Sequence, residues 1–136
     1  MIAMPVDAKT VSHFLAEYFE AFAACVRGER EIATLLACYA VPLIITSDDG
    51  VTGLTTDSEV ATVIQGQVDG LRALRYSGTR LLQSEVIGLN ATSALFRASL
   101  SRYDDQGDEI DCPTITYVIT NIDDGLRISM LAALGD

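Results

Sequence analysis

The sequence predicts a single α+β domain in which three N-terminal helices pack on a strongly curved antiparallel sheet. Helical periodicity dominates the first half of the chain, interrupted by a short strand pair around Ser47-Asp48-Asp49-Gly50, whereas almost everything after Tyr76 reads as long strands. At 136 residues with 49% hydrophobic residues, the chain is long enough to bury a substantial core. We expect one domain over residues 1–136, with residues 1–6 as a flexible N-terminal extension.

The first helix is expected from about Asp7 to Val26, because apolar residues recur there every three or four positions and form one wide stripe. Asp7 suits the N-cap, and Gly28 suits the end of the helix. A second, shorter helix is expected before Pro42, which cannot continue it. Its apolar face would carry four residues: Ile32, Leu35, Leu36 and Tyr39.

Residues 43–54 are expected to form a small hairpin, because two short strand-like segments flank a turn sequence. Thr56 and Glu59 then match a capping box that opens the third helix. That helix contains Gly66 and Gly70 on one face, where each costs about 1 kcal/mol relative to alanine. We expect a close approach to the sheet to explain both glycines.

Four strands follow at roughly 79–89, 92–103, 109–121 and 126–134, and the short turns between them predict an antiparallel meander. In the strand 92–103, Ala94, Phe96, Ala98 and Leu100 alternate with polar residues, so one face should meet the helices. The strand 109–121 carries no charge in the middle of either face. We therefore expect a partner subunit to cover the outer face, giving a homodimer packed sheet to sheet, with Arg97 near its boundary.

Charge and composition argue against several function classes. The formal net charge is −10 without a basic stripe, which disfavours nucleic acids and anionic membranes. No apolar run approaches the about 20 residues that span a bilayer, and the N-terminus lacks the pattern of a signal peptide. Cys25, Cys38 and Cys112 show no paired spacing, so we expect small buried thiols in a reduced, cytoplasmic location.

The order of these elements resembles the nuclear transport factor 2-like superfamily, which includes SnoaL-like polyketide cyclases and ketosteroid isomerases. The resemblance spans about Val11 to Leu134. FLAEYFEAFAACVRGE is similar to the opening helix, PLIITSDDG to the first strand and turn, and FRASL and YVITNIDDGLRIS to the long strands and last hairpin. The resemblance implies a cystatin-like α+β cone with a pocket between the first helix and the concave sheet.

Ketosteroid isomerases supply a catalytic pattern to compare. They use a tyrosine on the first helix and a protonated aspartic acid on a late strand as oxyanion donors, and a carboxylate near the first strand moves the proton. Tyr18 falls at the tyrosine position, whereas Thr46 or Ser47 falls at the base position and Tyr117 near the late aspartic acid. Two of the three positions differ, which argues against isomerase activity but keeps Tyr18 and Tyr117 as hydroxyl candidates.

Asp111 is a third candidate, because it lies early in its strand and could face the pocket mouth. The competing interpretation is an exposed carboxylate at a strand end. His13, the single histidine, falls off the apolar stripe and cannot build a metal site alone. The paired aspartates 48/49, 104/105 and 123/124 all fall in expected turns, where aspartate caps its own backbone.

The function expected from this resemblance is binding of a small hydrophobic molecule bearing a carbonyl or hydroxyl group. The expected pocket lining is Phe14, Tyr18, Phe22, Phe96, Leu100, Ile115 and Tyr117. Any catalysis would be isomerisation, dehydration or cyclisation without a metal, nucleotide or other cofactor, because no glycine-rich phosphate loop is present. The alternative is a noncatalytic dimerisation or partner-binding module whose pocket is filled. A cavity above about 300 Å³ with the Tyr18 hydroxyl unpaired would favour the ligand.

Overall fold

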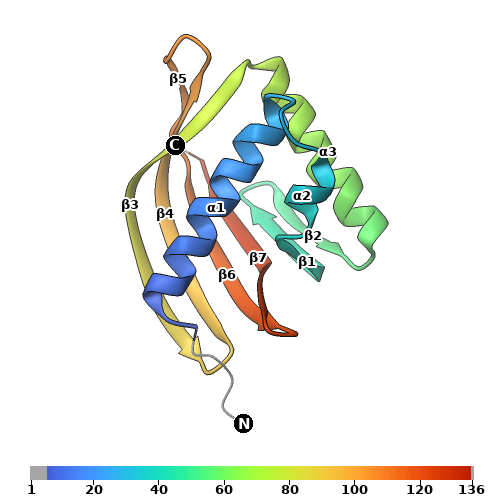
Figure 1. The fold of residues 1–136 in the computed structure, drawn as a ribbon, viewed down its shortest axis with the longest axis vertical. Helices are drawn as coiled ribbons and strands as arrows, with labels where there is room; N and C mark the ends of the chain where they lie inside the picture. Colours follow the sequence, from blue (N-terminus) through green and yellow to red (C-terminus); the bar gives the residue numbers. More distant parts are fainter. Residues whose placement is uncertain (1–5, 136) are drawn as a thin grey trace.

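The computed structural model describes residues 6–135 and confirms the α+β prediction (Figure 1). Three helices pack on a curved sheet: α1 (Ala8–Val26), α2 (Ile32–Leu36) and α3 (Asp57–Ala73). The strands are β1 (Tyr39–Ser47), β2 (Gly50–Leu54), β3 (Tyr76–Asn90), β4 (Ser93–Asp104), β5 (Glu109–Asp111), β6 (Thr114–Ile122) and β7 (Gly125–Leu134). Of the expected N-terminal extension, residues 1–5 lie outside the described residues, and Val6 is buried in the core.

The sheet is mixed rather than wholly antiparallel. Its strand order is β2-β1-β7-β6-β4-β3, with β5 paired to β4. The predicted meander of β3, β4, β6 and β7 is confirmed, since each successive pair is antiparallel. The predicted hairpin also forms, but β1 joins β7 in parallel. That pairing links segments from opposite ends of the chain, so no local pattern indicates it.

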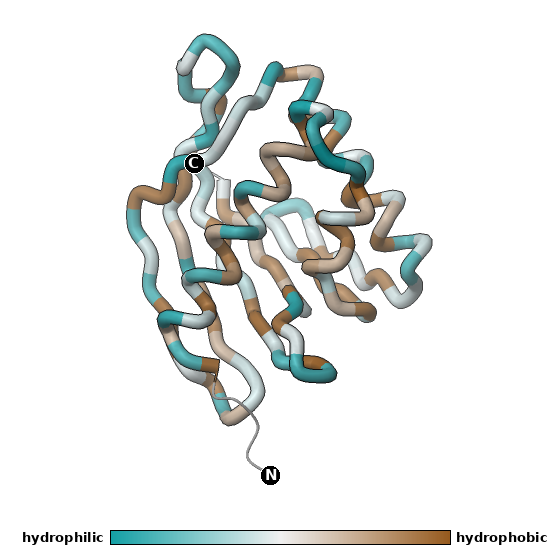
Figure 2. The backbone as a smooth tube through the Cα atoms, viewed as in Figure 1, coloured by the Kyte–Doolittle hydropathy of each residue, from teal (hydrophilic) through white to brown (hydrophobic). Residues whose placement is uncertain are grey.

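Helix α1 begins and ends where its sequence predicts. The Asp7 carboxylate accepts a hydrogen bond from the Thr10 backbone N–H at 2.8 Å, which caps the first turn. Gly28 follows the helix at φ +79°, a conformation that glycine adopts without a Cβ penalty. Figure 1 shows α1 lying across the concave face of the sheet, and Figure 2 shows hydrophobic and hydrophilic residues alternating along it. The buried residues of α1 belong to the hydrophobic core and pack against β3 and β4.

Helix α3 confirms the capping prediction and corrects the glycine prediction. The Thr56 hydroxyl accepts from the Glu59 N–H at 3.1 Å, while the Glu59 carboxylate reaches one residue further back, to the Thr55 N–H at 2.9 Å. Gly66 and Gly70 do not approach the sheet. Both are exposed, and a Cβ atom at either position would meet open space. Nothing in the structure explains these two glycines.

The second helix is shorter than predicted. It ends at Leu36, so Tyr39 opens strand β1 instead of lying on the helix face. Residues 38–39 pair with β7 instead of continuing the helix. The Ile128 N–H donates to the Cys38 carbonyl at 2.7 Å, and Tyr39 is the cross-strand partner of Ile128. Pro42 lies inside β1 at a register shift, where a missing N–H is tolerated.

The predicted strand 109–121 is two strands. Cys112 and Pro113 separate β5 from β6, because proline cannot donate to the ladder. The hydrophilic loop between β4 and β5 projects beyond the end of the sheet, and β5 returns antiparallel to β4 (Figures 1 and 2). The break places Asp111 beside Arg102 on β4.

Candidate functional site

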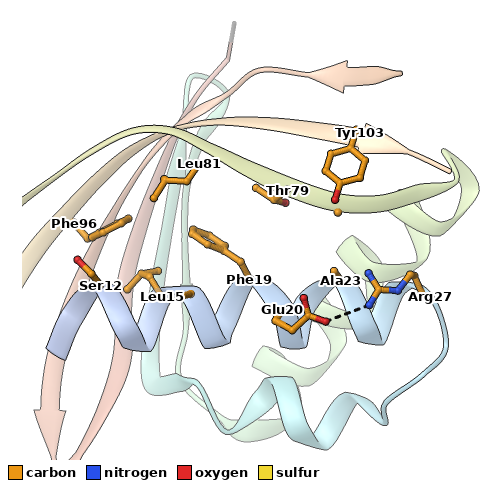
Figure 3. A pocket seen from close by; sticks show the side chains of 12 residues that line it. Ser12, Leu15, Phe19, Glu20, Ala23, Arg27, Thr79, Leu81, Phe96 and Tyr103 are labelled. Atoms are coloured by element: carbon orange, nitrogen blue, oxygen red, sulfur yellow. Dashed lines mark hydrogen bonds and ion pairs between the residues drawn. The ribbon is translucent and has the colours of Figure 1, made fainter. Parts of the chain in front are cut away.

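Two cavities lie between α1 and the concave face of the sheet. The larger has a volume of about 280 Å³ and is lined by Ser12, Leu15, Ala16, Phe19, Glu20, Ala23, Arg27, Gly78, Thr79, Leu81, Phe96 and Tyr103 (Figure 3). The smaller has a volume of about 60 Å³ and is lined by Tyr18, Phe19, Phe22, Gln67, Tyr76, Thr79, Leu100, Arg102, Ile115, Tyr117 and Leu131. Phe19 and Thr79 belong to both linings, so they form the wall between the cavities.

The larger cavity has an apolar end and a polar end (Figure 3). Leu15, Phe19 and Phe96 lie at the apolar end, whereas Glu20 and Arg27 lie at the other. The Arg27 guanidinium donates to the Ser77 carbonyl at 2.6 Å and to the Glu20 carboxylate at 3.3 Å. Arg27 therefore ties the end of α1 to β3, and its charge is already compensated.

Gly78 allows Tyr103 to form part of this wall. A Cβ atom at Gly78 would collide with the Tyr103 hydroxyl, so only glycine lets that ring lie across β3. The guanidinium of Arg80 sits 4.5 Å from the centre of the Tyr103 ring and holds it by a cation–π contact.

An aromatic cluster fills most of the space where a single pocket was expected. The Tyr18 and Tyr39 hydroxyls form a buried hydrogen bond of 2.5 Å. The Tyr18 ring also packs edge-on against the Tyr117 ring, with centroids 6.0 Å apart. The Tyr18 hydroxyl is thus paired, and the cavity beside it is small. A ligand site here was expected to combine a cavity above about 300 Å³ with an unpaired Tyr18 hydroxyl. Neither condition is met beside Tyr18, which favours a filled core at this point.

The Tyr117 hydroxyl differs from that of Tyr18. The side chain is only 3% exposed, yet its hydroxyl makes no hydrogen bond to any of residues 6–135. Every fully enclosed side-chain nitrogen or oxygen within the described residues has a partner. The Tyr117 hydroxyl therefore retains access to the smaller cavity that it lines. Burial raises the pKa of Tyr117 well above its usual value, so the group stays protonated and can donate a hydrogen bond.

Arg102 brings a second donor to the smaller cavity. Its Nε donates to Asp111 Oδ1 at 2.7 Å and its Nη2 donates to Asp111 Oδ2, which makes a bidentate pair. Its Nη1 has no hydrogen-bond acceptor within residues 6–135. Sequence reasoning missed Arg102, although a signal existed: position 102 continues the alternation of Ala98 and Leu100 and so places a cation on the inner face.

The residues predicted to line one pocket are divided between the two cavities, apart from Phe14. Tyr18, Phe22, Leu100, Ile115 and Tyr117 line the smaller cavity, and Phe96 lines the larger. Phe14 packs against the core but lines neither cavity. Asp111 holds Arg102 without lining either cavity. His13 is exposed, as expected for a surface residue, and its Nε2 lies 3.0 Å from a Glu17 carboxylate oxygen.

The two cavities supply hydrogen-bond donors but little basicity. No carboxylate or histidine of residues 6–135 lines the smaller cavity. Among the described residues, Glu20 is the one carboxylate that lines the larger cavity, and it is paired with Arg27. Nor do residues 6–135 contain a group of three or more His, Cys, Asp or Glu side chains arranged to hold a metal ion. Within the same range, the helices lack the combination of length and apolar character needed to cross a membrane.

A curved sheet with an N-terminal helix across its concave face, and cavities between the two, defines the class of α+β cone proteins. The family model described as NTF2-like protein (DUF6841) matches residues 7–136, and the chain belongs to this family. The predicted superfamily is therefore confirmed. No curated protein sequence matches the chain.

Solved structures from several organisms share the fold. A protein of unknown function with a cystatin-like fold from Nostoc punctiforme PCC 73102 superposes with a TM-score of 0.73 at 10% identity, covering 98% of this chain and 96% of that one. A candidate dehydratase of the NTF2-like family from Streptomyces avermitilis gives 0.70 at 15% identity, covering 96% of each chain. The yeast UBP3-associated protein BRE5 gives 0.71 at 15% identity, covering 94% of this chain and 95% of that one. These likenesses show the fold alone.

Proposed function

We propose that this NTF2-like domain binds a small, mostly apolar molecule that carries an oxygen acceptor. The observation that supports this most is the Tyr117 hydroxyl, a buried donor without an acceptor within residues 6–135. The hydroxyl faces the smaller cavity, so a ligand oxygen can accept its hydrogen bond in place of a water molecule.

The ligand would use both cavities. About 60 Å³ is too small for the body of a ligand, but it accommodates a carbonyl group or a water molecule. The neighbouring 280 Å³ lies just below the range of about 300–1,000 Å³ that is typical of ligand sites. Phe19 separates the two and is half-buried, so a change of its rotamer would join them. The apolar body would lie against Leu15 and Phe96, and the oxygen would reach Tyr117.

Binding is better supported than catalysis. Proton transfer at the ligand would need a base within hydrogen-bond reach. The tyrosines that line the smaller cavity cannot serve, because burial raises the pKa of Tyr18, Tyr76 and Tyr117. Donation from Tyr117 would polarise a carbonyl without removing a proton. Elimination remains the reaction class to assay first, since a structural neighbour is named as a candidate dehydratase.

Replacing Tyr117 by phenylalanine tests this proposal, with acetophenone as the probe. The variant removes the hydroxyl and keeps the ring, so affinity should fall by about tenfold, the value of one hydrogen bond. Ser101→Ala is the control, because it also removes a buried hydroxyl but one that lines neither cavity. Chemical-shift titrations would measure both. Equal affinity of the Tyr117→Phe variant and the unaltered protein would remove Tyr117 from the site.

A second candidate function is a noncatalytic dimerisation module, and an apolar row on the outer sheet face favours it. Cross-strand partners run from β2 to β3 in one line: Gly53, Ile44, Met130, Val118, Leu95 and Ile87. These positions alternate with the buried residues Tyr117 and Phe96, so the row faces away from the helices. Ile44 is 42% exposed and Ile87 is 47% exposed. An uncovered apolar row of this kind suits a partner.

A second copy of the chain is the occupant that the charges favour. Arg97 and Glu85 are cross-strand partners on the same face, one row away from Leu95. In a twofold interface, Arg97 of one protomer can meet Glu85 of its partner, and the reverse contact forms at the same time. The face is therefore complementary to itself. Ligand binding on the inner face and dimerisation on the outer face are compatible.

We also propose a cytoplasmic location. Its support is that Cys25 and Cys38 are thiols in the part of the chain that the structure describes.

A further inference from the structure

We propose that Arg102, aimed by Asp111, makes the smaller cavity selective for neutral carbonyl groups over carboxylates. This inference rests on the proposed function, because it concerns the polar end of the same ligand. It assigns a positioning role to Asp111 and a specificity-determining role to Arg102, in addition to the hydrogen bond from Tyr117.

The first step is the direction of Arg102. The bidentate pair with Asp111 occupies the Nε and one Nη2 proton and fixes the plane of the guanidinium. Arg102 pairs across strands with Thr79, which forms part of the wall between the cavities. The Nη1 group remains as the unpaired edge of a side chain that lines the smaller cavity.

The second step is the convergence of donors. Tyr117 and Arg102 both line the same 60 Å³, and neither donor has an acceptor there within residues 6–135. Burial raises the pKa of Tyr117 while the Arg102 charge acts in the opposite direction, which places the two groups within electrostatic reach. One ligand oxygen placed between Tyr117 and Arg102 can accept a hydrogen bond from each of them.

The third step is the charge of that oxygen. Asp111 already compensates the Arg102 cation, so the pair is formally neutral. A carboxylate would add a second anion to one guanidinium, in a cavity whose other lining side chains carry no charge. It would also enter a protein of formal net charge −10. A ketone or ester oxygen accepts the same hydrogen bonds without either cost.

Three ligands of similar size separate the effect of the hydrogen bonds from the effect of charge. Acetophenone has a neutral carbonyl and benzoate has a carboxylate. Cumene has a methyl group where acetophenone has its carbonyl oxygen, so it cannot accept a hydrogen bond. Titration of the unaltered protein should rank acetophenone first, by about tenfold over each of the others, since a hydrogen bond from a charged donor is the stronger kind. Equal binding of acetophenone and cumene would overturn the inference, because the donors would then not contact the ligand. Failure of all three to bind would overturn the proposed function itself.

Asp111→Asn provides the sharper readout. The variant preserves the shape of the side chain but leaves the Arg102 cation uncompensated, so the ratio of benzoate to acetophenone affinity should rise by about tenfold or more. A merely structural role for Asp111 would weaken both ligands together. Asp108→Asn is the control, because it makes the same change of charge at an exposed position of the β4–β5 loop. An unchanged ratio in Asp111→Asn would exclude Arg102 as the source of selectivity.

Discussion

Raising the pH above 10 should unfold the protein over a narrow pH range. Tyr18, Tyr39 and Tyr117 are each at most 5% exposed, and burial raises the pKa of all three. In the unfolded chain, a tyrosine titrates near its usual value of about 10. The folded protein therefore retains protons that the unfolded chain releases, and the free energy of unfolding falls as the pH rises.

The expected slope is large. Below pH 10 all three phenols are protonated in both states, so their contribution to stability is fully present. Above that value each phenol lowers the free energy of unfolding by about 1.4 kcal/mol per pH unit, or about 4 kcal/mol for the three. A domain is stable by only about 5–15 kcal/mol, so two pH units approach or exceed the whole stability. Tyr39→Phe should reduce the slope by about a third.

Two signals recorded together would check this prediction. The chain contains no tryptophan, so phenolate absorbance can be followed without overlap. The absorbance of the buried phenolates should appear together with the loss of the circular dichroism of the helices. Phenolates forming well before the helices are lost would show that these tyrosines are accessible to hydroxide in the folded state.

Replacing Val118 by glutamate should convert the protein from a dimer to a monomer. Val118 lies in the middle of the outer apolar row, between Met130 and Leu95. In a sheet-to-sheet dimer, the substitution would bury two carboxylates near the twofold axis, at a cost of several kcal/mol for each ion. The folded protomer should be little affected, because Val118 is only half-buried in the single chain.

Sedimentation measured over a range of concentrations separates the possibilities. Ala91→Glu is the control, because it adds the same charge at an exposed turn between β3 and β4. The unaltered protein and this control should sediment as dimers, and Val118→Glu as a monomer. A monomeric unaltered protein at every concentration, or a dimeric Val118→Glu, would contradict an interface on this face.

Local patterns predicted most of the helices and the meander. Asp7 and Thr56 cap their helices as expected, because capping depends on residues three positions apart. The parallel pairing of β1 with β7 depends on contacts between the two halves of the chain, and it drew Tyr39 into a strand. The break between β5 and β6 could have been predicted, because Pro113 lacks the N–H that a strand interior needs. The residues on both sides alternate in a strand-like pattern, however, which favoured one continuous strand.

The site was harder to predict than the fold. The first helix and the late strand do bring Tyr18 and Tyr117 together, with ring centroids 6.0 Å apart. The Tyr18 hydroxyl is paired with the Tyr39 hydroxyl and is therefore not available to a ligand. This contact depends on the pairing of β1 with β7, which places Tyr39 in a strand instead of the predicted helix. Whether space remains beside these rings depends on the packing of Phe19, which no spacing in the sequence reveals. Solved structures at 10–15% identity share the fold without assigning the chemistry of these residues.

The position of bound acetophenone tests the central claim most directly. Nuclear Overhauser contacts between the ligand protons and assigned side chains would locate it in solution. We expect contacts from the ring of the ligand to Leu15 and Phe19 in the larger cavity, and from its methyl group to Tyr117. Contacts confined to Leu95 and Val118 on the outer face, or no contacts at all, would contradict the account.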